Sequence, residues 1–165
     1  MTIRVLTPSD REAFFELTKT VVEALENKDW LIPMNEEEAD ATFGDDSEDV
    51  ILGAFYDGTL VATLGLFHDI RDYAEELPDK FHSLMGAEIG EAMVRPDFRR
   101  NGLMNQLVEA LQTYIPSSHL DYLLATAHPD NISNHLIQKA GFTLLKVFER
   151  RGYTRNMYFN VNSTK

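Results

Sequence analysis

The sequence contains no cysteine among its 165 residues. This absence excludes disulfide bonds, a cysteine nucleophile and metal sites built from thiolate ligands. A chain without disulfides also suits a reducing compartment, and we predict a cytoplasmic location. Every mechanism that passes through a covalent cysteine intermediate is therefore excluded.

Long apolar runs and an excess of positive charge are also absent. No stretch approaches the roughly 20 apolar residues that a bilayer span requires, and residues 1–4 lead into a strand-like segment, so we expect neither a secretory signal nor a membrane partner. The formal net charge is −12. Because nucleic-acid binding depends on cations that neutralise phosphates, DNA and RNA are poor partners. The acidic field slightly favours a cationic amine as substrate.

Histidines at metal-binding spacing are missing too. None of the five lies four residues from another, which is the spacing that presents two ligands on one helix face. Together with the lack of cysteine, this predicts no metal site. The five are His68, His82, His119, His128 and His135.

The length fits one domain covering residues 1–165, and no linker, repeat or low-complexity segment divides it. The expected order is strand, helix, short helix, three strands, helix, strand, helix and two strands. This predicts an α/β sheet that mixes hairpins with crossovers. Strands are expected at 3–6, 50–56, 60–67, 87–94, 121–126, 142–149 and 156–162, and helices at 14–25, after Asn35, from Leu103 to near Pro116 and at 131–140.

Several local signals fix the ends of these elements. Asp57-Gly58 stands between two β-rich runs and predicts a tight hairpin turn. Gly141 is a C-cap candidate for the last helix, and Gly152 lies in the turn of a final hairpin. The helix after Gly102 is expected to carry Tyr114 on its apolar stripe.

The segment Val94–Met104 carries the clearest functional signal. A strand ends in a basic loop containing Arg99, Arg100 and Gly102, and the loop opens a helix. Unpaired amides of a first helical turn and the positive end of the helix dipole bind anions, and adjacent arginines attract phosphate. This pattern predicts a phosphate-binding loop.

A second informative segment runs from Asn131 to Phe142. An Asn opens this helix as a capping candidate, and Gly-Phe closes it. With the basic loop, this segment resembles the GNAT superfamily of acyl-CoA N-acyltransferases. That family's signature places Gln or Arg, two residues, Gly, one residue and Gly or Ala in order. Arg99 and Gly102 match, and Met104 departs at the last position.

The resemblance implies a single-domain GNAT-like α/β (α+β) fold, with a mixed sheet of about seven strands, splayed central strands and about four helices. It also implies acetyl-CoA as the acyl donor and no metal. The residues expected to bind the cofactor are Ala92, Met93, Val94, Arg99, Arg100, Asn101, Gly102, Leu103, Met104, Asn131 and Ser133. The amide near Met93 is expected to stabilise the developing oxyanion.

The expected reaction needs a general base and an acid for the leaving thiolate. Glu88 and Glu91 are the candidate bases, and strand alternation places them on opposite faces. The family often uses a tyrosine acid six residues after the Asn of the second segment, where this sequence has Ile137. Tyr153 or Tyr158 takes this role, or solvent protonates the thiolate.

The resemblance thus predicts an N-acetyltransferase acting on a primary amine of a small molecule or peptide, by direct attack in a ternary complex. The alternative is a non-catalytic acyl-CoA-binding module, suggested by Ile137. A third reading, a transferase directed at tRNA or the ribosome, is disfavoured by the acidic charge. We expect the acceptor pocket to involve the first helix, residues 30–33 and the final hairpin. Sheet edges can pair between copies, which leaves a homodimer open.

Overall fold

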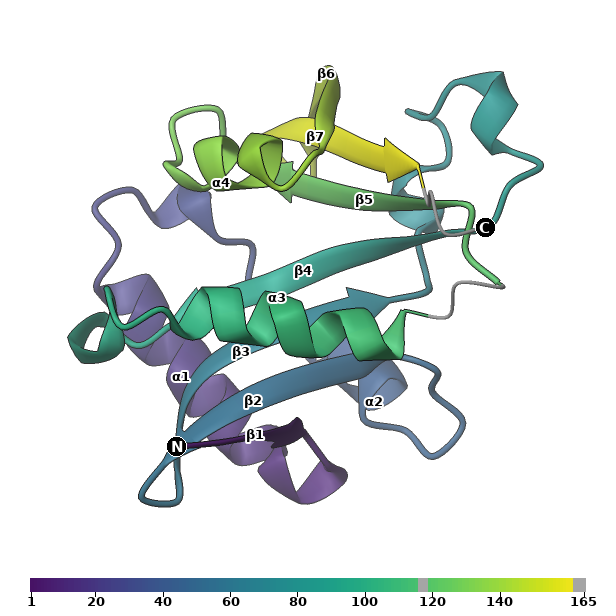
Figure 1. Ribbon diagram of the computed structural model, residues 1–165. Coiled ribbons are helices and arrows are strands. Elements are labelled where there is room, and N and C mark those ends of the chain that lie inside the picture. Colours follow the sequence, from purple (N-terminus) through teal and green to yellow (C-terminus); the bar gives the residue numbers. More distant parts are fainter. Residues whose placement is uncertain (116–118, 162–165) are drawn as a thin grey trace. The chain divides into compact units, whose positions relative to one another are not determined.

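The computed structural model describes residues 1–115 and 119–161 (Figure 1). Its strands form one seven-stranded mixed sheet in the order β1-β2-β3-β4-β5-β7-β6. The expected Pro116 and Asn162 boundaries lie outside the described residues. The strands are β1 Thr2–Val5, β2 Val50–Tyr56, β3 Thr59–Phe67, β4 Gly86–Val94, β5 Tyr122–Ala127, β6 Thr143–Arg150 and β7 Tyr153–Val161, and the α-helices are α1 Arg11–Glu23, α2 Glu36–Thr42, α3 Leu103–Leu111 and α4 Ser133–Lys139.

The single domain packs as two compact units, and β4 contributes to both. The first unit comprises Met1–Lys28, Pro33–Phe67 and Gly90–Ile115, and the second comprises Asp29–Ile32, His68–Ile89 and Pro116–Lys165. The predicted order of elements and the α/β class are confirmed.

The first unit is built on the antiparallel strands β1, β2 and β3. Asp57 and Gly58 have φ values of 48° and 77°, which is the geometry of the tight hairpin turn that the sequence predicts. Helix α3 crosses in front of β2 and β3, while α1 lies behind them (Figure 1). Residues recurring at helical spacing face the sheet from both sides and are buried: Phe14, Leu17, Val21, Leu103, Leu107 and Leu111.

Tyr114 corrects one prediction. Helix α3 ends at Leu111 and continues as a 3₁₀ turn, Gln112–Tyr114. A 3₁₀ turn rotates about 120° per residue rather than 100°, so the apolar stripe no longer faces the sheet. Tyr114 is consequently 43% exposed instead of lying in the core.

The entry into α1 is held by an ion pair. Asp10 Oδ2 accepts hydrogen bonds from Arg4 Nη1 at 2.7 Å and from the Thr7 amide at 2.7 Å. The hydrogen bond from Arg4 outweighs the opposite effect of burial and lowers the pKa of Asp10 to about 2. Because the folded-state pKa is below the unfolded value, this stabilisation is complete above about pH 4 and is lost as pH falls through about 2.

We therefore predict that Arg4→Met lowers the free energy of unfolding at pH 7, by less than the full pKa shift implies because solvent screens the half-exposed Arg4 side chain. Urea unfolding between pH 2 and pH 7 measures this effect. The variant should lose part of the wild-type slope between pH 4 and pH 2. A slope identical to that of the wild type would show that Arg4 is not what lowers the pKa.

The second unit contains the antiparallel strands β5, β7 and β6 and the first residues of β4. Strand β4 runs parallel to β5, and its register joins Gly86–Glu88 to Tyr122–Leu124 only. The ladder ends there although both strands continue, as expected for splayed central strands. The core of the second unit is a cluster of aromatic and aliphatic residues: Tyr73, Leu77, Phe81, Tyr122, Leu124, Phe148 and Met157.

Two boundaries in this unit differ from the sequence prediction. Strand β7 begins at Tyr153 rather than Asn156, because Arg151 and Gly152 form a two-residue turn with φ values of 53° and 83° that pairs Arg150 directly with Tyr153. Helix α4 begins at Ser133, and Asn131 precedes it, accepting a hydrogen bond from the Ser133 amide at 2.9 Å. The predicted end is confirmed, since Gly141 follows the helix with a φ of 96°.

Candidate functional site

The basic loop between β4 and α3 belongs to the first unit and is held in place by Arg95. The Arg95 amide donates to Val61 O at 2.8 Å, and its guanidinium donates to both carboxylate oxygens of Asp97 at 2.7 and 2.6 Å. The same guanidinium lies over the Phe98 ring at 5.1 Å. Arg95 is thus engaged in shaping the loop, whereas Arg99 and Arg100 are exposed.

Gly102 sets the start of α3 through its backbone conformation. It is the N-cap residue with a φ of 71°, in the left-handed region that favours glycine, and a Cβ there would meet nothing within 4 Å. Glycine is therefore required by the turn and not by crowding. The helical ladder begins with Gln106 N–H donating to Gly102 O, so the amides of Leu103 and Met104 point out of the helix start.

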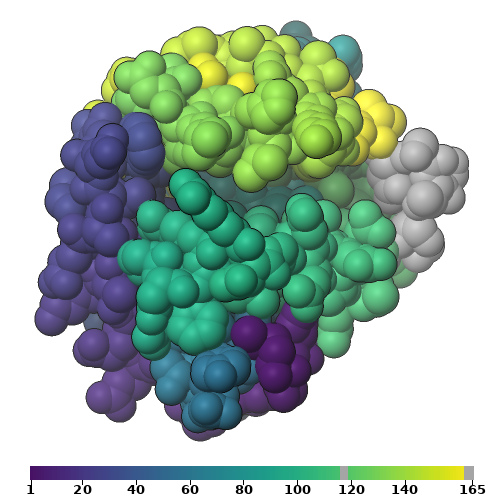
Figure 2. Space-filling view, turned by 60° about the vertical axis from the view of Figure 1, so that its left-hand side comes forward, coloured from purple at the N-terminus to yellow at the C-terminus, as the bar shows by residue number. Residues whose placement is uncertain are grey.

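The helix start combines a fixed first turn with two features that attract an anion. Leu103 is buried and fixes the first turn against the core, and the exposed Arg99 and Arg100 precede it. The helix dipole adds partial positive charge at the same end. Figure 2 shows the teal and green surface of this segment facing solvent. The sequence prediction of a basic, glycine-bearing helix start is matched by this geometry, which can accept phosphate.

Strand β4 has an irregularity at Glu91, whose φ is 50°. We interpret this value as a bulge, in which an added residue bends the strand and interrupts side-chain alternation. The Glu91 carbonyl accepts a hydrogen bond from the Thr63 hydroxyl at 2.7 Å, which holds the bulge to β3. Met93 is buried, whereas Ala92 is exposed. The prediction that Glu88 and Glu91 lie on opposite faces assumed regular alternation of side chains along β4. This alternation is interrupted at Glu91.

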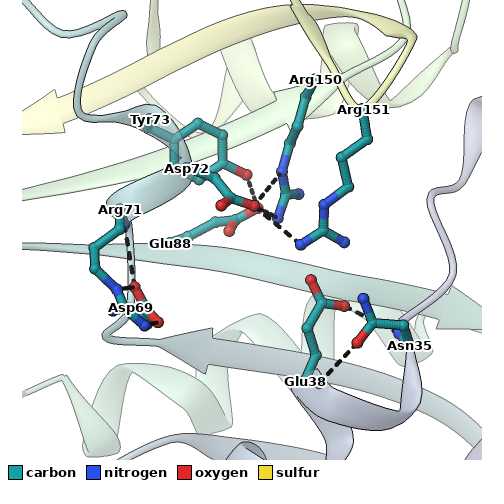
Figure 3. A network of polar contacts seen from close by, with 9 residues as sticks. All are labelled: Asn35, Glu38, Asp69, Arg71, Asp72, Tyr73, Glu88, Arg150 and Arg151. Carbon is teal, nitrogen blue, oxygen red and sulfur yellow. Dashed lines mark hydrogen bonds and ion pairs between the residues drawn. The ribbon is translucent and has the colours of Figure 1, made fainter.

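Glu88 lies in the second unit and is bound by a buried tyrosine (Figure 3). The Tyr73 hydroxyl donates to Glu88 Oε1 at 2.8 Å, and the Tyr73 side chain is fully buried. Burial, reinforced by the negative charge of Glu88, raises the pKa of Tyr73 well above its usual value. Tyr73 therefore remains a hydrogen-bond donor over the working pH range and holds the carboxylate in one orientation.

Two arginines of the final hairpin extend this network. Arg150 and Arg151 each donate to Asp72 Oδ2 at 3.1 Å, and the Arg150 guanidinium lies over the Tyr73 ring at 5.0 Å. Figure 3 shows Arg150 reaching from the hairpin toward Tyr73 and Asp72. The 68–85 connection is thus tied to β4 and to the hairpin by polar contacts.

Asn134 on α4 is a half-buried junction that sequence reasoning missed. Its amide nitrogen donates to His128 O at 2.7 Å and to Asn131 O at 2.6 Å, and its Oδ1 accepts from Asn156 at 3.0 Å and from Tyr158 at 2.7 Å. The Tyr158 hydroxyl proton therefore lies in the hydrogen bond to Asn134. This network joins the loop before α4 to β7.

We predict that Asn134→Ala lowers the free energy of unfolding by about 1–3 kcal/mol, because the Tyr158 hydroxyl and the Asn156 side-chain amide both lose their acceptor. Tyr158→Phe is the matched control: it removes one hydrogen bond of the network and should cost about 1 kcal/mol. Urea unfolding of both variants measures the difference. Equal losses would contradict the junction role of Asn134.

The predicted site residues divide between the two units. Glu91, Ala92–Val94 and Arg99–Met104 lie in the first, and Glu88, Asn131, Ser133 and Tyr153 lie in the second. Tyr153 is half-buried at the start of β7, and Ile137, at the expected acid position, is half-buried on α4.

The described residues contain neither a cluster of metal-ligating side chains nor a membrane-spanning helix. Within 1–115 and 119–161, no three His, Asp or Glu side chains gather closely enough to hold a metal ion. In the same ranges, no helix has the length and apolar character needed to cross a bilayer. A depression of about 340 Å³ in the first unit is lined by α1, the β2–β3 turn and Arg95, and includes none of the predicted site residues.

A model of the acetyltransferase (GNAT) family matches residues 12–142. The chain belongs to this family. The match covers both signature segments, and family membership implies acyl transfer, typically from an acyl-CoA donor. No curated protein is similar enough to this GNAT chain to count as a match.

Solved structures of other proteins share the GNAT fold. The N-acyl amino acid synthase FeeM from uncultured soil microbes has a TM-score of 0.76 at 19% identity, covering 98% of this chain and 95% of that one. An N-acetyltransferase from Staphylococcus aureus Mu50 has a TM-score of 0.72 at 16% identity, covering 98% of both chains. The ribosomal-protein-S18-alanine N-acetyltransferase of Escherichia coli has a TM-score of 0.69 at 16% identity, covering 98% and 94%. These likenesses confirm the fold.

Proposed function

We propose that this protein transfers the acetyl group of acetyl-CoA to a primary amine of a small molecule or peptide. The observation that carries the proposal is the start of α3, where Gly102 in the left-handed conformation, outward amides and exposed arginines form an anion-binding turn in a GNAT chain. When bound, acetyl-CoA supplies an activated acyl group as a thioester.

Binding of the donor is assigned to the basic loop and the start of α3. Main-chain amides at 101–104 would hold the diphosphate, and the Arg99 and Arg100 side chains would add charge-assisted hydrogen bonds. The space beside the Gly102 backbone is open, which fits close approach of a phosphate to the backbone. Asn131 and Ser133 of the second segment are proposed as further contacts to the cofactor.

The β4 backbone is proposed to orient the acyl group. Residues Ala92, Met93 and Val94 follow the Glu91 bulge, and a bulge turns main-chain groups out of the regular ladder. The Met93 amide would donate to the thioester carbonyl oxygen. A donor fixed in advance toward the developing oxyanion is usually the largest catalytic contribution in acyl transfer.

Glu88 is proposed as the general base. Its carboxylate is oriented by the buried Tyr73 hydroxyl, which donates to Glu88 Oε1 at 2.8 Å. The amine would lose its proton to Glu88, directly or through water, as its nitrogen bonds to the acyl carbon and the carbon–sulfur bond breaks. Glu91 is the less favoured base, because its main chain forms the bulge held by Thr63.

The thiolate of the leaving group needs a proton, and Tyr153 is proposed to supply it. Tyr158 is disfavoured because its side chain is buried and its hydroxyl donates to Asn134 within a hydrogen-bond network. Tyr153 is half-buried at the start of β7, and none of the hydrogen bonds of that network involves it. Ile137 has no proton to give.

The proposal is tested by release of free CoA from acetyl-CoA in the presence of a panel of primary amines, detected with a thiol reagent. Amine-dependent thiol release with formation of the acetylated amine is the expected result. Tight binding of acetyl-CoA with no turnover across the panel would instead support the non-catalytic acyl-CoA-binding module.

A further inference from the structure

Arg155 on β7 is a buried cation with one hydrogen-bond donor, Nη2, that has no partner among the described residues. Its residue exposure is 3%, and its Nη1 donates to Thr154 O at 2.9 Å. Its Nη2 is buried and has no hydrogen-bond partner among the described residues. A guanidinium remains charged at all working pH values, so burial with an unsatisfied donor is costly unless an anion completes the site.

The surroundings of Arg155 increase this cost. Its cross-strand partner on β6 is Phe148, which is apolar, and its guanidinium lies over the Tyr153 ring at 5.3 Å. Burial, followed by repulsion from Arg150, lowers the pKa of Arg155, and the charge of Asp29 offsets this only in part. Arg150 itself is paired with Asp72. The guanidinium groups of Arg150 and Arg155 therefore repel each other. Arg150 has Asp72 as its partner, whereas Nη2 of Arg155 has no acceptor among the described residues.

Arg155 shares a face with the proposed base. The register pairs Phe148 with Arg155 and Arg150 with Tyr153, which places these four side chains on one face of the β6–β7 hairpin. On that face, the centroids of the Tyr73 and Phe148 rings lie 5.8 Å apart, and the Tyr73 hydroxyl donates a hydrogen bond to Glu88. The unsatisfied Nη2 of Arg155 thus belongs to the same side of the second unit as Glu88.

The charge pattern selects the kind of anion. A guanidinium edge matches a carboxylate or a phosphate. Asp29 acts on Arg155, and Asp72 and Glu88 lie in the network on the same face, so a doubly charged phosphate would meet repulsion from several carboxylates. A monoanionic carboxylate carries less charge and can accept the hydrogen bond that Nη2 offers.

We propose that Arg155 binds the carboxylate of the acyl acceptor, so that the acceptor is a free amino acid. This inference rests on the proposed function and names its substrate class. Arg155 is then a specificity-determining residue: it anchors the carboxylate on the face where Glu88 receives the proton of the amine. The substrate carboxylate then supplies the acceptor that Nη2 lacks within the described residues.

The test compares each amino acid with its own carboxamide. Acceptors are α-amino acids and the straight-chain series from glycine to 5-aminopentanoate, whose increasing length measures the distance between amine and carboxylate sites. For the best acceptor, wild-type kcat/KM should exceed that of the carboxamide by about 10- to 100-fold, the usual effect of losing a charge-assisted hydrogen bond. Arg155→Met should reduce this ratio to about 1, and Arg155→Lys should leave an intermediate ratio.

Arg71→Met is the matched control. Arg71 is an exposed arginine of the same unit whose partner is Asp69, and its side chain is 89% exposed. The control should keep the wild-type ratio. A wild-type enzyme that acetylates carboxamides as well as carboxylates, or an Arg155→Met variant that keeps the preference, would overturn the inference.

Thermal unfolding without substrate provides a readout independent of turnover. Arg155→Met should raise the Tm, because it replaces an incompletely paired buried charge by an apolar side chain of similar length. A purely structural arginine would give a lower Tm and an unchanged carboxylate preference.

Equilibrium titration with N-acetyl amino acids and their amides separates the inference from the proposed function. If no amine is turned over, the proposed function fails, and the titration still decides the role of Arg155. Binding that requires the carboxylate and is lost in Arg155→Met supports it. Binding that ignores the carboxylate overturns it.

Discussion

Glu88→Gln is expected to lower kcat at neutral pH by about 10²- to 10⁴-fold, the usual contribution of a general base, while the Kd for acetyl-CoA stays within about twofold. The amide keeps the shape of the carboxylate and can still accept the hydrogen bond that Tyr73 donates at 2.8 Å. What it loses is the capacity to take a proton. Steady-state kinetics with a saturating amine, together with titration of acetyl-CoA, separates these effects.

The matched control is Glu91→Gln on the same strand. Its carbonyl holds the β4 bulge through Thr63, and this contact survives the substitution, because it involves only the main chain of residue 91. We expect Glu91→Gln to keep most of the wild-type kcat. A large loss in Glu91→Gln together with a normal Glu88→Gln would assign the base to Glu91 instead.

Arg99→Ala combined with Arg100→Ala is expected to raise the KM for acetyl-CoA by about 10- to 100-fold, with a much smaller change in kcat. The reason is the loss of charge-assisted hydrogen bonds to phosphate, worth about 1.5–3 kcal/mol each as an upper guide. Both side chains are exposed and precede the α3 start, so their removal should leave the fold intact.

Salt dependence distinguishes this role from a structural one. Because exposed charges are screened, the wild-type KM should rise with ionic strength more steeply than that of the double variant. Arg71→Met, another exposed arginine, serves as the control for a general loss of positive charge. An unchanged KM in the double variant would remove the arginines from donor binding.

Much of the fold followed from local patterns in the sequence. Asp57-Gly58 and Gly141 occupy positions with positive φ, where few other residues are stable, so these turns and ends could be located from residue type alone. The α3 start was predictable for the same reason at Gly102. The boundary errors arose where local patterns were weak: an arginine, Arg151, takes positive φ in the last hairpin turn, and the change to a 3₁₀ turn after Leu111 leaves no compositional mark.

The candidate site was predictable only where it consists of contiguous residues. The basic loop and the helix after Asn131 are continuous segments and could be recognised as such. Tyr73 lies in a charged connection without periodicity, and its contact with Glu88 spans 15 positions. Asn134 gains its role from Tyr158, which lies 24 positions away.

Arg155 illustrates the same limit for a single side chain. Its position on a strand gave no signal beyond that of an ordinary surface arginine, and its burial follows from the packing of the β6–β7 hairpin. Contacts between distant segments depend on tertiary packing, which single-sequence patterns do not encode.

The central claim is that the start of α3 binds the diphosphate of coenzyme A, and a crystal structure of the protein with CoA tests it most directly. We predict phosphate oxygens within hydrogen-bond distance of the amides at Leu103 and Met104, with Arg99 or Arg100 directed at the same group. CoA bound elsewhere, or amides at Gly102–Met104 that bond to a side chain of the protein in the presence of saturating CoA, would contradict it.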